Sequence, residues 1–224
     1  MTATFWDAHA AARLTQGPVI PLDPPPRMEW TQRPGIGPGT EIIGEDLTGR
    51  RIVELGCGAG HNTAHLTAAG AAVVGVDRSA GQIRRAVAHY GHTGAQFRHA
   101  DALPYLTRAS QGLDVIFSVF GAIGTSEPTR LLSACARSLT HHGILAFCLP
   151  HPQRTGAIPA YPRTRDTATL QDGRTHLIEH WDMAPVAWTS ALNQAGLTVS
   201  GVYHLHAPAD ARWPTTLLIT ARKL

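Results

Sequence analysis

Lysine, cysteine and charge are scarce in this sequence, and each scarcity excludes a class of protein. Lys223 is the only lysine, so almost all of the basic charge lies on scattered arginines, and the net charge is +3. Nucleic-acid binders gather basic residues on one face, so we expect no nucleic-acid partner. The three cysteines, Cys57, Cys135 and Cys148, lack any repeated spacing. This pattern argues against a disulfide framework.

Long apolar runs and metal-binding motifs are also missing. No apolar stretch reaches 18 residues, so we expect no membrane contact. The first residues lack a basic region followed by an apolar run, which predicts no signal peptide and a cytoplasmic protein. No CxxC or HExxH motif occurs, so we predict no metal site. The oligomeric state stays open at this stage.

What the sequence does contain is an alternation of apolar strands and helices. With 224 residues and 43% hydrophobic content, the chain suits one compact domain over 1–224. Strands alternating with helices predict a mostly parallel sheet that helices cover on both faces. The expected strands are 51–55, 71–76, 96–99, 113–119, 143–149, 197–205 and 215–221. The expected helices are 3–14, 40–47, 61–69, 79–90, 129–139 and 185–195, with Ser79 as an N-cap.

Two segments lack such a pattern. Residues 17–40 are crowded with proline and glycine and should wrap over the surface. Within them, Asp23-Pro24-Pro25-Pro26 is interpreted as a linker. Residues 150–180 are expected to be irregular.

The run Glu54-Leu55-Gly56-Cys57-Gly58-Ala59-Gly60 leaves the first strand and enters a helix. Glycine lets a backbone approach a ligand closely, and the amides at the start of the helix favour a carboxylate. A dinucleotide-binding turn reads GxGxxG, whereas this one reads GxGxG. A tight turn without a ligand is the alternative interpretation.

This run resembles the first motif of class I S-adenosyl-L-methionine (SAM)-dependent methyltransferases, [E/D]xGxGxG, and the resemblance continues in register over residues 50–152. It implies a Rossmann-like seven-stranded, mostly parallel sheet with helices on both faces, and SAM as cofactor. An acid that ends the second strand, here Asp77, would hold the ribose; the alternative is a helix cap. The implied cofactor contacts are Glu54, Gly56, Cys57, Gly58, Gly60, Asp77, Arg78, Ile83, Asp101, Ala102 and Ser118.

Two further contacts in this set have stated partners. Ile83 stands where the family places an apolar side chain against adenine. Asp101, in a segment similar to GDaxxLP, would meet the adenine amine, with a turn-stabilising aspartate as the alternative. Methyltransferases that modify nucleic-acid bases or glutamine carry [N/D]PP[Y/F] at the end of the fourth strand. This sequence has Ser118-Val119-Phe120-Gly121 there, which argues against DNA, RNA and glutamine substrates.

The acceptor site of this family is built from variable segments. Here these are an N-terminal lid over residues 1–45 and a cap insertion over 150–190. Phe5-Trp6-Asp7 resembles the aromatic pair and acid that open many such enzymes, although Trp6 could instead pack in the core. The predicted acceptor contacts are Trp6, Trp30, Phe120, His151, His180 and Trp181.

His151 follows the fifth strand in Pro150-His151-Pro152, at the ligand end of the sheet. It is the predicted catalytic residue, as a general base or as a group that orients the acceptor. Its alternative is a purely structural role in the turn. His176 and His180 would share a face if their segment were helical, and a metal there would need a third ligand.

The resemblance therefore implies methyl transfer from SAM to an oxygen, nitrogen or carbon of a small molecule, in specialised metabolism. Two alternatives stay open. One is a nicotinamide-dependent oxidoreductase, and the other is a protein that binds SAM without transferring the methyl group.

Overall fold

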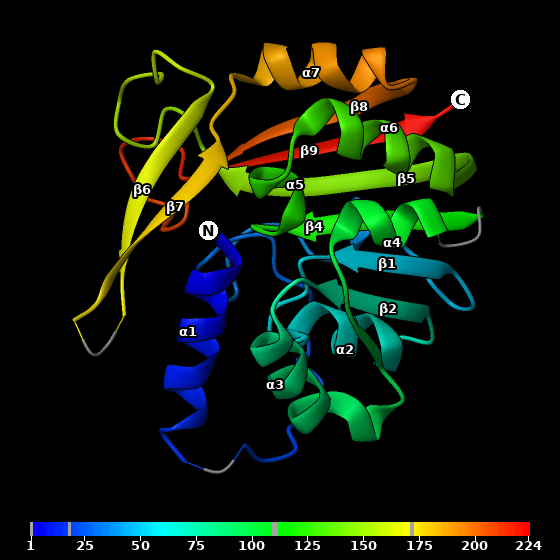
Figure 1. Ribbon diagram of the computed structural model, residues 1–224. Helices are drawn as coiled ribbons and strands as arrows, with labels where there is room; N and C mark the ends of the chain where they lie inside the picture. Colours follow the sequence, from blue (N-terminus) through cyan, green and yellow to red (C-terminus); the bar gives the residue numbers. More distant parts are fainter. Residues whose placement is uncertain (1, 18, 109–111, 171–172) are drawn as a thin grey trace.

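The computed structural model describes residues 2–17, 19–108, 112–170 and 173–224. Its centre is a seven-stranded sheet in the order β3-β2-β1-β4-β5-β9-β8 (Figure 1). The pairs from β3 to β5 are parallel, and the pairs β5–β9 and β9–β8 are antiparallel. The strands are β1 (Arg51–Leu55), β2 (Ala72–Asp77), β3 (Gln96–His99), β4 (Leu113–Val119), β5 (Leu139–Pro150), β8 (Leu197–Leu205) and β9 (Thr216–Lys223). The mostly parallel Rossmann-like sheet predicted from the sequence is confirmed.

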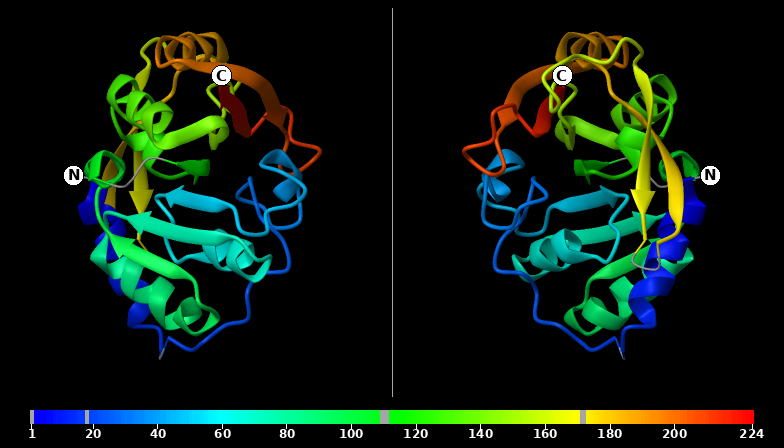
Figure 2. Two further views of the ribbon diagram at one scale, coloured as in Figure 1. Left: turned by 90° about the vertical axis from the view of Figure 1, so that its right-hand side faces the viewer. Right: turned by 90° about the vertical axis from the view of Figure 1, so that its left-hand side faces the viewer.

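Helices and loops cover both faces of this sheet, as the two edge-on views of Figure 2 show. The helices are α1 (Thr2–Leu14), α2 (His61–Ala68), α3 (Ala80–Tyr90), α4 (Ala102–Arg108), α5 (Ala122–Thr125), α6 (Pro128–Ser138) and α7 (Pro185–Gln194), with 3-10 turns η1 (Thr40–Ile42) and η2 (Gly91–Thr93). Successive side chains of β4 point to opposite faces of the sheet, and both faces carry apolar side chains that need to be covered. Ile116 packs into the cluster with α6 and α7, whereas Val115 and Phe117 pack into the cluster with α2 and the N-terminal loop.

The helix boundaries follow the capping chemistry. Ser79 accepts a hydrogen bond from the Gln82 amide and is the N-cap of α3, as predicted. Helix α6 begins one residue earlier than predicted because Glu127 caps it and Pro128 occupies its first turn. The predicted helix over 40–47 is wrong beyond the single turn η1, and Gly44 follows that turn with φ of +139°.

The segment 150–180 departs from the sequence prediction. Instead of an irregular stretch, the chain forms an antiparallel hairpin of β6 (Arg163–Thr169) and β7 (Thr175–Trp181), a separate two-stranded sheet. Arg163-Thr164-Arg165-Asp166-Thr167-Ala168-Thr169 is polar on both faces, so it lacks the apolar alternation that would have revealed a strand. Helix α4 was also not predicted from the sequence. It begins at Ala102, directly after Asp101.

Strand order fixes where a ligand can bind. In the sheet, β1 lies between β2 and β4. The loop after β1 leads toward β2 and the loop after β4 leads toward β5, so the two loops diverge at this point. In open sheets of this kind, ligands bind beyond the carboxyl ends of the strands at such a switch point. Figure 1 shows α1 lying across this edge, beside α3. In the described part of the chain, no helix is long and apolar enough to cross a membrane.

Candidate functional site

A cavity of about 410 Å³ lies at this edge of the sheet, between α1, the loop after β1 and the ends of β2, β3 and β4. Its volume is in the range of small-molecule sites. The predicted residues that line it are Trp6, Glu54, Gly56, Cys57, Gly58, Asp77, Arg78, Asp101, Ala102 and Phe120. Most of the cofactor contacts implied by the sequence therefore meet in one place.

The loop after β1 contains three glycines, and all have positive φ. Each position favours glycine for a different structural reason. A Cβ on Gly56 would lie 2.7 Å from the backbone of Gly121 and Ala122, so Gly56 permits the loop to pack against α5. A Cβ on Gly60 would lie 2.6 Å from the Phe97 ring. A Cβ on Gly58 would meet nothing within 4 Å. Gly58 therefore leaves open space where a ligand can approach the backbone.

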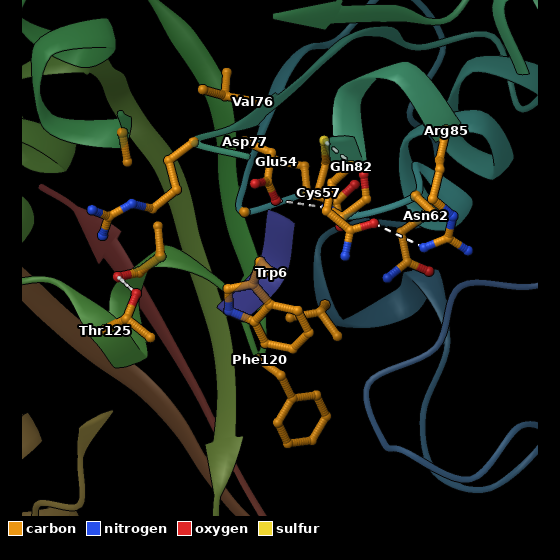
Figure 3. A pocket seen from close by; sticks show the side chains of 18 of the residues that line it. Trp6, Glu54, Cys57, Asn62, Val76, Asp77, Gln82, Arg85, Phe120 and Thr125 are labelled. Carbon is orange, nitrogen blue, oxygen red and sulfur yellow. Dashed lines mark hydrogen bonds between the residues drawn. The ribbon is translucent and has the colours of Figure 1, made fainter. Parts of the chain in front are cut away.

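Asp77 lies at the centre of the cavity wall, as Figure 3 shows. Its Oδ2 accepts the Gly58 amide at 2.9 Å and its Oδ1 accepts the Ser79 amide at 2.8 Å. Burial raises its pKa, and these two amides oppose that effect. Ser79 is the N-cap of α3, so Asp77 is not needed as the cap of that helix. Each of its oxygens keeps a lone pair for a further donor.

Glu54 lies deeper, on β1, and is buried. Thr63 Oγ1 donates to its Oε2 at 2.5 Å. Desolvation raises the pKa of Glu54 to about 8, even though the Thr63 hydrogen bond acts in the opposite direction. This shift favours the protonated form of the carboxyl group at neutral pH.

Arg78 and Asp101 face each other across one end of the cavity, with Nε and Oδ1 3.4 Å apart. Both side chains are partly exposed, so this ion pair adds little stability. Its position at the ends of β2 and β3 places two polar groups beside the space where a planar base could bind.

Two aromatic rings lie at the front of the cavity (Figure 3). Trp6 comes from α1, and Phe120 follows β4 with a φ of +47°. A bulky residue with positive φ is a strained conformation that is held by its surroundings. Here the Phe120 amide donates to the Cys148 carbonyl at 3.0 Å, which holds the backbone of Phe120 at the cavity wall.

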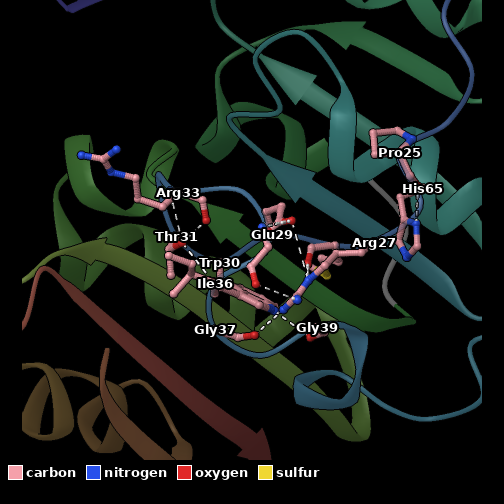
Figure 4. Close-up of polar contacts among 12 residues, drawn as sticks. Pro25, Arg27, Glu29, Trp30, Thr31, Arg33, Ile36, Gly37, Gly39 and His65 are labelled. Atoms are coloured by element: carbon pink, nitrogen blue, oxygen red, sulfur yellow. Dashed lines mark hydrogen bonds and ion pairs between the residues drawn. The ribbon is translucent and has the colours of Figure 1, made fainter. Parts of the chain in front are cut away.

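Several predicted residues lie away from the cavity lining. Ser118 is buried and donates to the Leu55 carbonyl at 2.7 Å, so it supports the loop after β1. Ile83 packs beside the cluster of Ala64, Ala86 and Phe97. Trp30 is fully buried, and its Nε1 donates to the Gly39 carbonyl inside the N-terminal loop (Figure 4).

His151 does not line the cavity either, and it is fully buried. The Gln153 amide donates to its Nδ1 at 3.0 Å, so the ring proton lies on Nε2, which donates to His204 Nδ1 at 2.7 Å. Burial and the neighbouring His204 lower the pKa of His151 to about 4. With both nitrogens engaged, the ring has no free lone pair for a proton in this arrangement.

His180 and Trp181 belong to β7. His180 lies within 3.4 Å of Asp166 and 3.6 Å of Asp182, beside Arg154. Arg154 Nη1 is 2.8 Å from the buried Asp182, so this cluster attaches the hairpin to the segment after β5. Trp181 packs against the main core. Within the described residues, no group of three His, Cys, Asp or Glu side chains is arranged to hold a metal.

One side of the cavity has no recognisable signal in the sequence. Four basic side chains and two amides also line it, from three different helices: His9, Arg13, His61, Asn62, Gln82 and Arg85. Short motifs cannot reveal such a set, because its members come together only through the packing of α1 on α3.

Comparison with known proteins gives consistent matches. A family model described as a methyltransferase domain matches residues 52–143. A ubiquinone biosynthesis O-methyltransferase of Bordetella avium is 24% identical over 204 residues, which cover 90% of this chain and 78% of that protein. A demethylmenaquinone methyltransferase of Clavibacter sepedonicus is 35% identical over 107 residues, 46% of this chain and 42% of its own length.

Solved structures match the fold. A SAM-dependent methyltransferase structure from Listeria monocytogenes has a TM-score of 0.67 at 16% identity, covering 82% of this chain and 95% of that one. A DhpI complex with S-adenosylhomocysteine (SAH) has a TM-score of 0.62 at 19% identity, covering 99% of this chain and 95% of that one.

Proposed function

We propose that this chain is a class I SAM-dependent methyltransferase that acts on a small molecule, as its matches to such enzymes support. We further propose that the cavity beside Asp77 binds SAM and the acceptor together. The observation that carries this proposal is the open space over Gly58 next to the Asp77 carboxylate. A ribose diol can donate to the free lone pairs of Asp77 while the backbone at Gly58 makes room for the cofactor.

The remaining roles follow from position. Arg78, Asp101 and Ala102 would hold the adenine, and the loop from Gly56 to Gly60 would run beneath the amino-acid part. Glu54, Cys57 and Ser118 would support that loop from below. SAM supplies an electrophilic methyl group, so the chain needs mainly to align the acceptor and to exclude water.

Trp6 and Phe120 would form the apolar wall against the acceptor. Both residues line the cavity, and Phe120 follows directly on β4. We propose that residues 1–45 act as the lid and residues 150–190 as the cap, because α1 brings Trp6 over the cavity and contacts β7. Trp30, His180 and Trp181 would then influence the acceptor only through these segments.

An oxygen acceptor is favoured, since a relative that covers 90% of this chain is named an O-methyltransferase. A cytoplasmic location agrees with the three cysteines, which are buried and unpaired. Specialised metabolism stays a prediction. A catalytic role for His151 would require the ring to leave its contact with His204.

Calorimetry with SAM, SAH and NADH tests the assignment of the cavity. We expect SAM and SAH to bind at one site with micromolar affinity, on the order of −8 kcal/mol, and NADH to give no heat. Failure of both SAM and SAH to bind would end the proposal, and binding of NADH alone would favour the oxidoreductase alternative.

A further inference from the structure

One end of the cavity is basic. Arg13 of α1 and Arg85 of α3 both line it, together with His9 and His61. In the described part of the chain, neither arginine forms an ion pair with an aspartate or glutamate. Arg85 Nη1 donates to Gln82 Oε1 at 2.9 Å, which fixes the direction of the guanidinium group without neutralising it.

The two arginines are close enough to affect each other. Burial and the charge of Arg13 lower the pKa of Arg85. Burial, Arg85 and Arg13 lower the pKa of His9, in that order, which favours the neutral form of its ring. The Nδ1 of His9 is also buried without a hydrogen-bond partner among the described residues. Like charges held together in a partly dry cavity are unfavourable until an anion lies between them.

We propose that this basic end binds a carboxylate or phosphate group of the methyl acceptor, an inference that rests on the proposed function. Arginine suits this purpose because its planar fork of donors matches the oxygens of either group. Gln82 and Asn62 border the same space. The acceptor is therefore a small organic acid.

Helix α1 also indicates the shape of this acceptor. Trp6, His9 and Arg13 are separated by three and four residues, so they share one face of the helix, and all three line the cavity. From Trp6 to Arg13 the helix rises by about 10 Å. An apolar body against Trp6 and an acidic group at Arg13 would fit along this face.

The amino-acid end of SAM is the other possible source of a carboxylate. That end carries an ammonium group beside its carboxylate, so it has no net charge. A site with two arginines and no paired acid would repel the ammonium group. The charge of the site therefore favours a ligand with net negative charge over the cofactor.

The test uses the protein saturated with SAH and three phenyl compounds: benzoate, phenyl phosphate and neutral benzyl alcohol. We expect both acids to bind roughly tenfold or more tightly than benzyl alcohol, as hydrogen bonds to charged groups allow. Arg85→Met and Arg13→Met, on two different helices, should each abolish that preference. Arg84→Met is the matched control, because Arg84 is the exposed neighbour on α3 and does not line the cavity.

Three results separate the possibilities. Acids that bind no better than benzyl alcohol, or an equal loss in Arg84→Met, would overturn the inference while SAH binding still supports the methyltransferase. If Arg85→Met weakens SAH but not 5′-methylthioadenosine, which lacks the amino-acid group, the anion is the cofactor's own carboxylate and the inference is wrong. Absence of SAH binding in the unaltered protein would instead be a failure of the proposed function.

Discussion

The two ends of the cavity differ in charge and in origin. The end with Glu54, Asp77 and Asp101 is built from loops that follow neighbouring strands, and it carries acids. The end with Arg13 and Arg85 is built from helices, and its charges have no acidic partner in the described residues. This difference is the basis of our proposal that the two ends bind different molecules, with the nucleoside of the cofactor at the first and an acidic acceptor at the second.

The largest expected effect comes from the loop that forms the acidic end. Gly56→Ala would place a methyl group 2.7 Å from the backbone of Gly121 and Ala122 at a φ of +84°. We expect the protein to lose about 3 kcal/mol or more of stability and to lose SAH binding. Gly49→Ala is the control, because Gly49 has a φ of +70° but open space around it. Denaturant unfolding should show a loss of only about 1–2 kcal/mol there. Equal losses in both variants would contradict the close packing at Gly56.

The next prediction compares Asp77 with Asp114, an aspartate at the opposite end of the strands. Asp77→Asn should weaken SAH by about 1.5–3 kcal/mol, because hydrogen bonds to a charged group are lost. Asp114→Asn is the control, since Asp114 also accepts a backbone amide, that of Arg51, but lies at the start of β4. Calorimetry should find no change in SAH affinity for this variant. If the two variants bound SAH equally well, Asp77 would have only a structural role.

A third prediction concerns the buried acid beneath the same end. The folded protein keeps a proton on Glu54 up to a pKa of about 8, whereas the unfolded chain loses it near the ordinary value of 4.5. Between these values the folded state binds more protons, so this group makes the protein less stable as the pH rises. Glu54→Gln should remove that contribution. Denaturant unfolding at several pH values from 5 to 8 would show it, and an unchanged slope would contradict the shifted pKa.

The smallest effect on binding is expected at His151, which lies outside both ends. His151→Ala removes the contacts with Gln153 and His204, so stability should fall by about 1–3 kcal/mol while SAH affinity stays unchanged. The pH dependence has the opposite sign to that of Glu54. Because the folded-state pKa of His151 is lowered to about 4, the unfolded chain binds the extra proton between pH 4 and 6.5. Its contribution to stability is therefore present above pH 6.5 and is lost as the pH falls, and the variant should lack this loss.

Turnover on the true acceptor decides whether His151 has a catalytic role as well. A fall of about 10²–10⁴ in kcat for His151→Ala, without loss of folding, would support the general base predicted from the sequence. Unchanged turnover would leave it a structural residue.

The acidic end was predictable because its information is local. The run from Glu54 to Gly60 and the acid after β2 each lie within a few residues of a strand end, and parallel strands bring such ends together. The mostly parallel sheet was predictable for the same reason, since β1, β2 and β4 are short, largely apolar runs that begin or end close to a glycine.

The basic end could not be found in this way. Arg13 and Arg85 are 72 positions apart, and nothing near either of them distinguishes it from the exposed Arg84. Only the packing of α1 on α3 places them together. His151 shows the converse limit. It does follow β5 as expected, but its ring is buried against Gln153 and His204 and does not line the cavity. The polar hairpin of β6 and β7 was missed because both of its strands lack apolar alternation.

The most direct test is to measure SAH affinity in two variants, one from each end of the cavity. The account predicts that Asp77→Asn weakens SAH by about 1.5–3 kcal/mol, whereas Arg85→Met changes it by less than about 0.5 kcal/mol. That result would place the cofactor at the acidic end and leave the basic end for the acceptor. Comparable losses in both variants would show that one ligand spans the whole cavity, and this would contradict the division of the site.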